Sequence, residues 1–285
     1  MNDKMKNLWV RSVSGAVLVV VVLGAILWSK WSFAALLMAI LIGGESEFYR
    51  MAQKAGYTPQ KVLGFVAGAI MVAFILMWLL DDSTTVSSQY LIIAVGLALY
   101  IMMLIPVMFI CELYRKSPTP IANIGSTLMG IVYVAMPLAL LFFIPLLLGR
   151  GVWNPWALIF YIFIIWANDV CAYLVGMSIG KHRLFQRISP KKSWEGFIGG
   201  LVGAMAMGYV ASTFMEGTHA IWIGMALIAA ITGVFGDLVE SLLKRSVDVK
   251  DSGNILPGHG GWLDRFDALL LSIPFVFIYL VFCID

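Results

Sequence analysis

Long apolar stretches alternate with short polar connections along most of the chain. A helix needs about 20 residues to cross the hydrocarbon core of a bilayer. The stretches that reach or approach this length lie at about 10–28, 31–44, 62–80, 90–110, 121–148, 153–175, 195–214, 219–239 and 265–283. The second is short, and the fifth is long and interrupted by Pro137 and Pro145. The pattern predicts an all-α polytopic membrane protein with about nine transmembrane helices.

The basic residues give the orientation, because cytoplasmic loops carry an excess of Lys and Arg. With nine spans and a cytoplasmic N-terminus, 17 of the 19 basic residues fall on inner segments, and only Lys30 and Arg150 fall outside. A wrong number of spans would mix the basic and the neutral loops. We therefore expect a multi-pass protein of the cell inner (cytoplasmic) membrane, with its N-terminus in the cytoplasm and its C-terminus outside.

The composition describes a single membrane domain, since 61% of the 285 residues are hydrophobic and 12% are charged. We expect residues 1–150 to form a scaffold of lipid-facing helices, and residues 151–285 to carry two polar loops at 176–195 and 240–264. The basic start and first apolar run lack a small-x-small cleavage pattern, so they are interpreted as a retained span. The net charge of +3 gives no case for nucleic acid, because the basic residues follow the loops.

Ionisable residues near the C-terminus share one face of a predicted helix. Spacings of i, i+3, i+4 and i+7 relate Asp237, Glu240, Ser241 and Lys244. Asp264 and Asp267 lie one turn apart where the last apolar segment begins. Two such carboxylate pairs, brought together, could hold a hard cation. Magnesium suits them, because it usually takes one or two protein carboxylates and completes its shell with water and phosphate oxygens.

A glycine-rich turn, Pro257-Gly-His-Gly-Gly261, lies between the two carboxylate pairs. Its backbone N–H groups can approach an anion closely. The cations around it are Lys244, Arg245, Lys250 and Arg265. Carboxylates for a metal beside cations for phosphate indicate a site for a metal-bound nucleoside triphosphate.

The same segment resembles the signature of the phosphatidate cytidylyltransferase family. The positions that match are Ser241, Lys244-Arg245, Lys250-Asp251, Gly253, Leu256-Pro257, His259-Gly260-Gly261 and Asp264-Arg265-x-Asp267. Members of this family make CDP-diacylglycerol and pyrophosphate from CTP and phosphatidic acid. So many fixed positions within 27 residues, from Ser241 to Asp267, rarely match by chance.

A second polar stretch is also similar to this family. It contains Trp166-Ala-Asn-Asp169, and the box Ser189-Pro-Lys-Lys-Ser-Trp-Glu-Gly196. Two positions depart from the family pattern: Val170 replaces a hydroxyl residue after Asp169, and Ser193 replaces Thr in the box. Asp169 lies deep in an apolar run, where an unpaired carboxylate costs a few kcal/mol. It therefore needs a partner, which Lys192 or another loop cation could supply.

The resemblance implies roles for most of these residues. It makes 176–195 and 240–264 the expected catalytic loops and places the expected active site toward the cytoplasm. It implies a magnesium centre held by Asp237 and Asp264, to which Glu240 is added as a third candidate ligand, with room for a monovalent cation such as K⁺. The expected catalytic residues are Asp237, Asp264, Lys244, Arg245 and Asp267. The expected substrate-binding residues are Lys192, Ser193, Ser241, Lys250, His259, Gly260, Gly261, Arg265 and Asp169. The implied partners are CTP, phosphatidic acid and the bilayer, and a homodimer is left open.

Other interpretations stay open. A CTP-dependent lipid (polyprenol) kinase would move the γ-phosphate instead, and a transporter of phosphorylated solutes would use intramembrane carboxylates as coupling sites. His259 is nearly as well explained as a turn residue bonded to backbone. The small-xxx-small glycine pairs 196/200 and 199/203 favour helix packing over ligand contact. Glu45 and Glu47 could simply close the second span at the interface.

Overall fold

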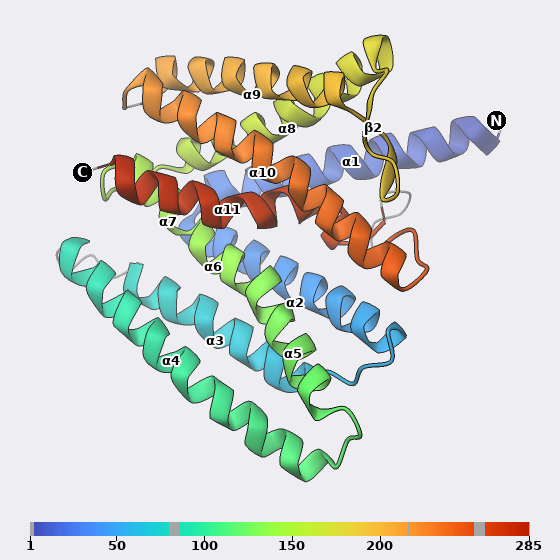
Figure 1. Cartoon of the computed structure of the whole chain (residues 1–285). Helices are drawn as coiled ribbons and strands as arrows, with labels where there is room; N and C mark the ends of the chain where they lie inside the picture. Colours follow the sequence, from blue (N-terminus) through green and yellow to red (C-terminus); the bar gives the residue numbers. More distant parts are fainter. Residues whose placement is uncertain (1–2, 80–85, 216, 254–259, 285) are drawn as a thin grey trace.

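The computed structural model describes residues 3–79, 86–215, 217–253 and 260–284. Most of these residues form helices that run side by side (Figure 1). In chain order the elements are α1 (Asp3–Trp28), α2 (Lys30–Lys54), α3 (Lys61–Leu79), α4 (Val86–Arg115), α5 (Pro120–Gly130), η1 (Ile131–Ala135), α6 (Met136–Leu141), α7 (Phe143–Leu148), α8 (Pro155–Ile179), β1 (Arg183–Phe185), β2 (Ser189–Ser193), α9 (Trp194–Phe214), α10 (His219–Ser246) and α11 (Leu263–Cys283).

Seven helical segments within the described ranges are long and apolar enough to cross a membrane. They are Lys30–Lys54, Val95–Arg115, Pro120–Leu148, Pro155–Ile179, Trp194–Phe214, His219–Ser246 and Leu263–Cys283. Two shorter apolar helices, Ser12–Trp28 and Lys61–Met77, fall at the predicted first and third spans. A helical polytopic membrane protein is therefore confirmed, and the count of nine and the orientation stay predictions.

The second span extends further than the predicted stretch 31–44. The helix α2 continues to Lys54, so Glu45 and Glu47 lie inside it, and both side chains are fully buried. Buried carboxylates inside a helix do not close a span at the interface.

The fifth span is broken where its prolines predict an interruption. Between α5 and α6 lies the π-helix η1, in which the N–H of Met136 donates to the carbonyl of Ile131, five residues back. Pro137 has no N–H to continue the ladder, so a wide turn beside it disturbs fewer hydrogen bonds. The α6 and α7 segments then continue the same apolar crossing to Leu148.

One short hairpin interrupts the all-helical pattern. Strands β1 and β2 are antiparallel, with Arg183 opposite Ser193 and Phe185 opposite Ser189. The hairpin is closed at its base by Glu195, which lies 2.6 Å from Nδ1 of His182 and accepts the backbone N–H of that residue. Within the predicted loop 176–195, α8 therefore continues to Ile179, the hairpin fills the middle, and α9 begins at Trp194.

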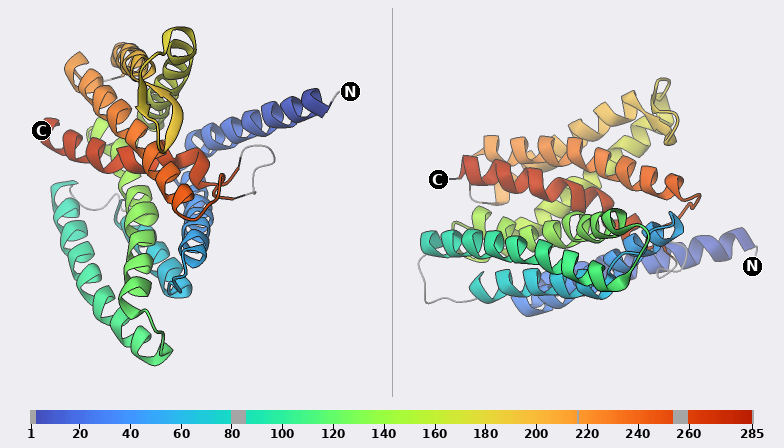
Figure 2. Two further views of the ribbon diagram at one scale, coloured as in Figure 1. Left: turned by 45° about the vertical axis from the view of Figure 1, so that its right-hand side comes forward. Right: turned by 60° about the horizontal axis from the view of Figure 1, so that its bottom comes forward.

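Helices α8 and α9 pack closely through the glycine pairs. A side chain at Gly199 would lie 2.5 Å from Val175, and one at Gly200 would lie 2.5 Å from Oδ1 of Asn168. These glycines therefore serve helix packing, as the spacing predicts. Figure 2 shows α9, α10 and α11 lying next to one another, with α1 projecting away from them.

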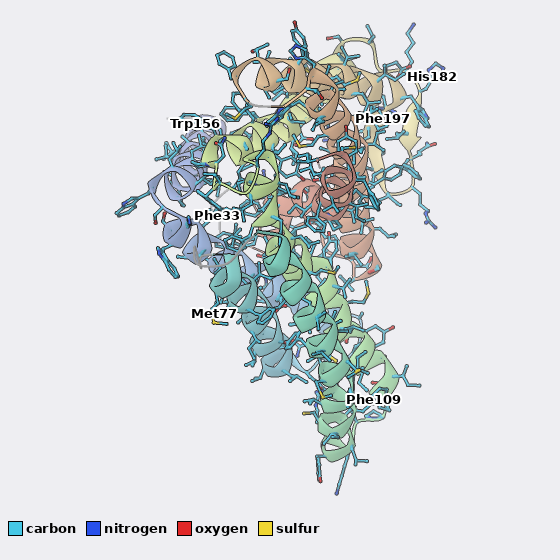
Figure 3. The ribbon with its side chains drawn as sticks, turned by 90° about the vertical axis from the view of Figure 1, so that its left-hand side faces the viewer. Phe33, Met77, Phe109, Trp156, His182 and Phe197 are labelled. Carbon is cyan, nitrogen blue, oxygen red and sulfur yellow. The ribbon has the colours of Figure 1, made fainter. Side chains whose placement is uncertain are left out.

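Apolar side chains cover the outer faces of the helices as well as the core. Phe33 is 2% exposed, whereas Met77 and Phe109 are 64% and 59% exposed on the outside (Figure 3). Large exposed apolar side chains over many helices are expected of a protein surrounded by lipid.

Candidate active site

The polar face of α10 is arranged as its spacing predicts. The hydroxyl of Ser241 donates to Oδ1 of Asp237 at 3.3 Å, one turn back. Nζ of Lys244 lies 2.5 Å from Oε2 of Glu240, also one turn back. Both pairs are i,i+4 neighbours on one helix face. Glu240 and Lys244 are buried, so this face points into the protein.

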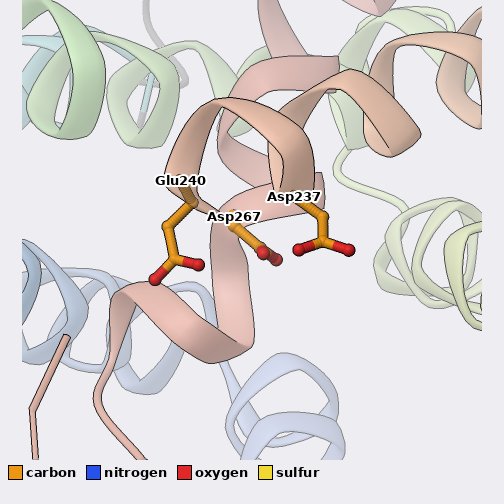
Figure 4. Close-up of side chains that lie close together, drawn as sticks. All are labelled: Asp237, Glu240 and Asp267. Atoms are coloured by element: carbon orange, nitrogen blue, oxygen red, sulfur yellow. The ribbon is translucent and has the colours of Figure 1, made fainter. Parts of the chain in front are cut away.

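The start of α11 adds a third carboxylate to those of α10. Oxygen atoms of Asp237, Glu240 and Asp267 all lie within 4.8 Å of one another. Figure 4 shows the side chain of Asp267 reaching toward Asp237 from the neighbouring helix. The helices approach closely because Gly236 has no side chain, and a Cβ there would lie 2.5 Å from the carbonyl of Asp267. We call Asp237, Glu240 and Asp267 the acidic cluster.

The acidic cluster fits a divalent cation. Three carboxylates converge there, and the adjoining Asp264 makes four, whereas two ammonium groups, from Lys192 and Lys244, pair with this set. When all are ionised, the set carries two formal negative charges in excess. Within the described part of the chain, neither Glu240 oxygen has a hydrogen-bond partner. Hard oxygen ligands and excess negative charge are what Mg²⁺ requires.

Asp264 is held by a cation and by backbone groups of residues 241–267, which we call the signature segment and to which Asp264 itself belongs. Its Oδ1 lies 2.6 Å from Nζ of Lys244. Its Oδ2 accepts the backbone N–H groups of Ser252 at 2.9 Å and Gly261 at 2.8 Å. Gly260 has a φ of +81°, a left-handed conformation that favours glycine. These contacts place Asp264 beside the acidic cluster, and its predicted role as a metal ligand stays a prediction.

Lys192 brings the hairpin to the same place. Its ammonium lies 2.6 Å from Oδ2 of Asp237 and donates to the carbonyl of Val234 at 3.3 Å. Asp169 on α8 is exposed and interacts electrostatically with Lys192 and Asp237. Lys192 is thus the cation near Asp169 that the sequence suggests, although its ion pair is with Asp237. Three segments, α8, the hairpin and α10, therefore meet beside the acidic cluster.

Three predicted phosphate ligands are exposed around this centre. Arg245, Lys250 and Arg265 are open to the surroundings, and Arg245 donates to the carbonyl of Val249 at 3.2 Å. Ser193 is buried and acts as the N-cap of α9, accepting the N–H of Gly196 at 3.1 Å. His259 lies outside the described residues. The substrate contacts of these residues stay predictions.

Sequence reasoning missed the role of Glu47, which it considered only as a residue that could close the second span. This carboxylate on α2 accepts three hydrogen bonds from the signature segment, from the hydroxyl of Ser252 at 2.7 Å and from the N–H groups of Trp262 and Leu263, each at 3.0 Å. The partners are more than 200 residues apart, so no local spacing links them. The available signal was an acidic residue beside an apolar stretch, which in a membrane points to function.

The fold and this centre define a polytopic membrane protein with partly or fully buried carboxylates and lysines where its helices meet. Residues 9–283 match the model of the Cytidylyltransferase family. A protein of Rickettsia bellii (strain RML369-C), named phosphatidate cytidylyltransferase, is 30% identical over 284 residues, covering 96% of this chain and 92% of the relative. The chain therefore belongs to the cytidylyltransferase family, and the resemblance of its signature is confirmed.

Two further relatives carry the same name, phosphatidate cytidylyltransferase. The protein of Staphylococcus aureus (strain COL) is 48% identical over 120 residues, which are 41% of this chain and 46% of the relative. The protein of Bacillus subtilis (strain 168) is 49% identical over 120 residues, which are 41% of this chain and 44% of the relative. In these two matches the chain spans less than half of the relative's length.

Proposed function

We propose that this chain is an enzyme of phospholipid biosynthesis that transfers CMP from CTP to phosphatidic acid. The observation that carries the proposal is the placement of Lys192 and Lys244 around one acidic cluster, Lys192 at Asp237 and Lys244 at Glu240 and Asp264. Family membership and the names of the relatives support the same reaction. A kinase or a transporter is not favoured by these relatives.

The proposed step is an in-line displacement at the α-phosphorus of CTP. A phosphate oxygen of phosphatidic acid forms the new bond to phosphorus, and the bond from that phosphorus to the bridging oxygen breaks. Its electron pair leaves with pyrophosphate, and the lipid becomes CDP-diacylglycerol. No nucleophile of the protein is needed, so the protein contributes positioning and electrostatic stabilisation.

The acidic cluster is the proposed magnesium site, with Asp237, Glu240 and Asp267 as its ligands. Asp264 adjoins it and stays a candidate ligand, and a monovalent cation such as K⁺ stays a prediction. Magnesium, when bound, would neutralise phosphate charge and polarise the reacting phosphorus. The carboxylates lie close together without a bound ion, because Gly236 lets α10 and α11 approach closely.

The two lysines are the proposed phosphate ligands. Each ammonium group is already oriented by a carboxylate, 2.6 Å away in both Lys192–Asp237 and Lys244–Asp264. An ammonium group has three donors, so each lysine can keep its carboxylate and still donate to a phosphate oxygen. Two anionic substrates can approach each other only if such cations offset their charge. Lys192 on the hairpin and Lys244 on α10 would offset the charge of the two substrates from two different elements.

We further propose nine spans with the N-terminus in the cytoplasm. Seven long and two shorter apolar helices support this number. The described ends of the chain lie on opposite sides of the molecule (Figure 1), as an odd number of spans requires. The hairpin and the C-terminal end of α10 lie toward the N-terminal side. The active site would then face the cytoplasm from the inner membrane of the cell, and a homodimer stays a prediction.

The proposal is tested with purified protein in detergent, supplied with CTP, magnesium and phosphatidic acid. CDP-diacylglycerol and pyrophosphate should form in equal amounts and depend on all three additions. A folded, monodisperse preparation that yields neither product would contradict the proposed function.

A further inference from the structure

The helix α2, in the N-terminal half of the chain, is in direct contact with the signature segment. A Cβ at Gly43 would overlap the indole ring of Trp262, and one at Gly44 would lie 3.4 Å from Leu263. Glycines on the opposite side are equally close, since a Cβ at Gly253 or Gly261 would overlap the carboxylate of Glu47. Small residues on both surfaces thus let the backbone of the signature segment lie against one carboxylate.

Glu47 contacts the signature segment both before and after residues 254–259. Its Oε1 accepts from the N–H of Trp262, and its Oε2 accepts from the N–H of Leu263, at the start of α11. The same Oε2 accepts from the hydroxyl of Ser252, which precedes Leu263 by eleven residues. Glu47 is fully buried and Ser252 is 5% exposed. A carboxylate at the start of a helix is favoured by the helix dipole and by the free N–H groups there.

The contacts continue from Glu47 to the phosphate-binding lysine. The hydroxyl oxygen of Ser252 lies 2.7 Å from Glu47 and 3.0 Å from Oδ2 of Asp264. The other oxygen of Asp264 lies 2.6 Å from Nζ of Lys244. A serine hydroxyl has one proton, so it links two carboxylates only while both are held in place. Any shift of Glu47 therefore changes the position of Asp264, and with it that of Lys244.

We infer that Glu47 is a positioning residue for the active site, which fixes the signature segment and, through Ser252 and Asp264, the ammonium group of Lys244. The inference rests on the proposed function in one respect, the role of Lys244 toward phosphate. It gives α2 a part in catalysis that its place in the lipid-facing scaffold does not suggest. Arg50 adds to the same attachment, donating to the carbonyl of Ser252 at 3.2 Å.

The test compares Glu47→Gln with Glu45→Gln. Glu45 is a matched control, because it lies two residues away on the same helix and is equally buried, and among the described residues its carboxylate has no hydrogen-bond partner. In Glu47→Gln we expect the KM for CTP to rise at least fivefold and kcat/KM to fall at least tenfold. Glu45→Gln should stay within twofold of the parent. A merely structural role would lower kcat with the folded fraction and leave the KM for CTP unchanged, and that result would overturn the inference.

Ser252→Ala gives a second variant that removes only a hydroxyl group. Because the effect of Glu47 on Asp264 passes through this hydroxyl, the Glu47→Gln/Ser252→Ala double variant should lose at least threefold less kcat/KM than the product of the single losses. Glu45→Gln combined with Ser252→Ala should show independent effects. If the losses of kcat/KM multiplied independently in both double variants, the link through Ser252 would be contradicted.

Hydrogen exchange provides a measurement that does not depend on turnover. The N–H groups of Trp262 and Leu263 should exchange at least tenfold faster in Glu47→Gln than in the parent, whereas Glu45→Gln should match the parent. Unchanged exchange in Glu47→Gln would overturn the inference even if the parent is active. If the parent makes no CDP-lipid, the proposed function fails, and the exchange rates still decide whether Glu47 holds this segment.

Discussion

The ammonium group of Lys192 on β2 lies 2.6 Å from the carboxylate of Asp237 on α10, and this ion pair attaches the hairpin to the acidic cluster. The residues are 45 positions apart in the sequence, in two different polar stretches. Their contact explains why a membrane protein with few charges keeps both stretches. Each supplies one part of a single centre.

Replacement of Lys192 by Gln should lower kcat/KM at least tenfold. The amide keeps a polar side chain, one atom shorter than that of lysine, but loses the charge that would offset phosphate. A tenfold loss corresponds to about 1.4 kcal/mol of transition-state interaction. Steady-state kinetics with CTP as the varied substrate measure the change. Lys191→Gln is the control, because its side chain is exposed on the same strand. Equal and small effects at both lysines would mean that the basic hairpin only orients the protein in the membrane.

Replacement of Asp237 or Asp267 by Asn should lower kcat by about two orders of magnitude and raise the magnesium concentration needed for half-maximal activity. Asn keeps the size of the side chain and removes an anionic ligand from the acidic cluster, which weakens binding of a hard cation. Magnesium titrations of the purified variants measure both effects. Asp248→Asn is the control, since this exposed residue has a φ of +54°, which Asn tolerates. Normal activity of either cluster variant at ordinary magnesium would exclude that residue as a ligand.

Replacement of Lys244 by Gln should reduce both activity and stability. This lysine is 9% exposed and pairs with Glu240 and Asp264, and the loss of one partner from a buried ion pair costs about 3–5 kcal/mol. Thermal unfolding in detergent should show a lower Tm, and kinetics a lower kcat/KM. Arg245→Gln should lower kcat/KM with little change in Tm, because Arg245 is exposed.

Lys54→Gln is the control for both substitutions, because Lys54 is an exposed basic residue at the end of α2 and is not part of the signature segment. It should change neither property. If Lys244→Gln lowered Tm but left the kinetics of the folded fraction unchanged, Lys244 would be a structural residue only.

Cysteine labelling should find opposite sides of the membrane at the two ends of α10. In a variant without the native Cys111, Cys171 and Cys283, a cysteine at Thr218 should react with an impermeant reagent added to intact cells. A cysteine at Asp248 should react only after the membrane is opened. Both positions are exposed, so access to each depends on the side of the membrane. Reaction of the cysteine at Asp248 in intact cells would contradict the cytoplasmic active site.

The polar face of α10 and the carboxylates of α11 could be predicted from sequence, because the spacing of helical neighbours is local. The i,i+4 pairs Asp237–Ser241 and Glu240–Lys244 are direct consequences of helix geometry. The glycine pairs that bring α8 and α9 together follow from similar spacing. The resemblance to the family signature indicated, in addition, which of these residues belong to one site.

The contact of Glu47 with the signature segment could not be predicted in this way. It joins elements more than 200 residues apart and depends on the packing of Trp262 against Gly43 of α2. The hairpin and the full length of α2 were missed for a different reason. Hydropathy marks where apolar stretches end, whereas hydrogen bonds and caps decide where a helix or strand ends.

The central claim is transfer of a nucleotidyl group, and the position of the label in CTP tests it most directly. Purified protein is incubated with magnesium, phosphatidic acid and CTP labelled either at the α-phosphate or at the γ-phosphate. The account predicts that the α-label appears in the lipid and that the γ-label appears only in pyrophosphate. Transfer of the γ-label to the lipid would contradict the account and would identify a CTP-dependent lipid kinase instead.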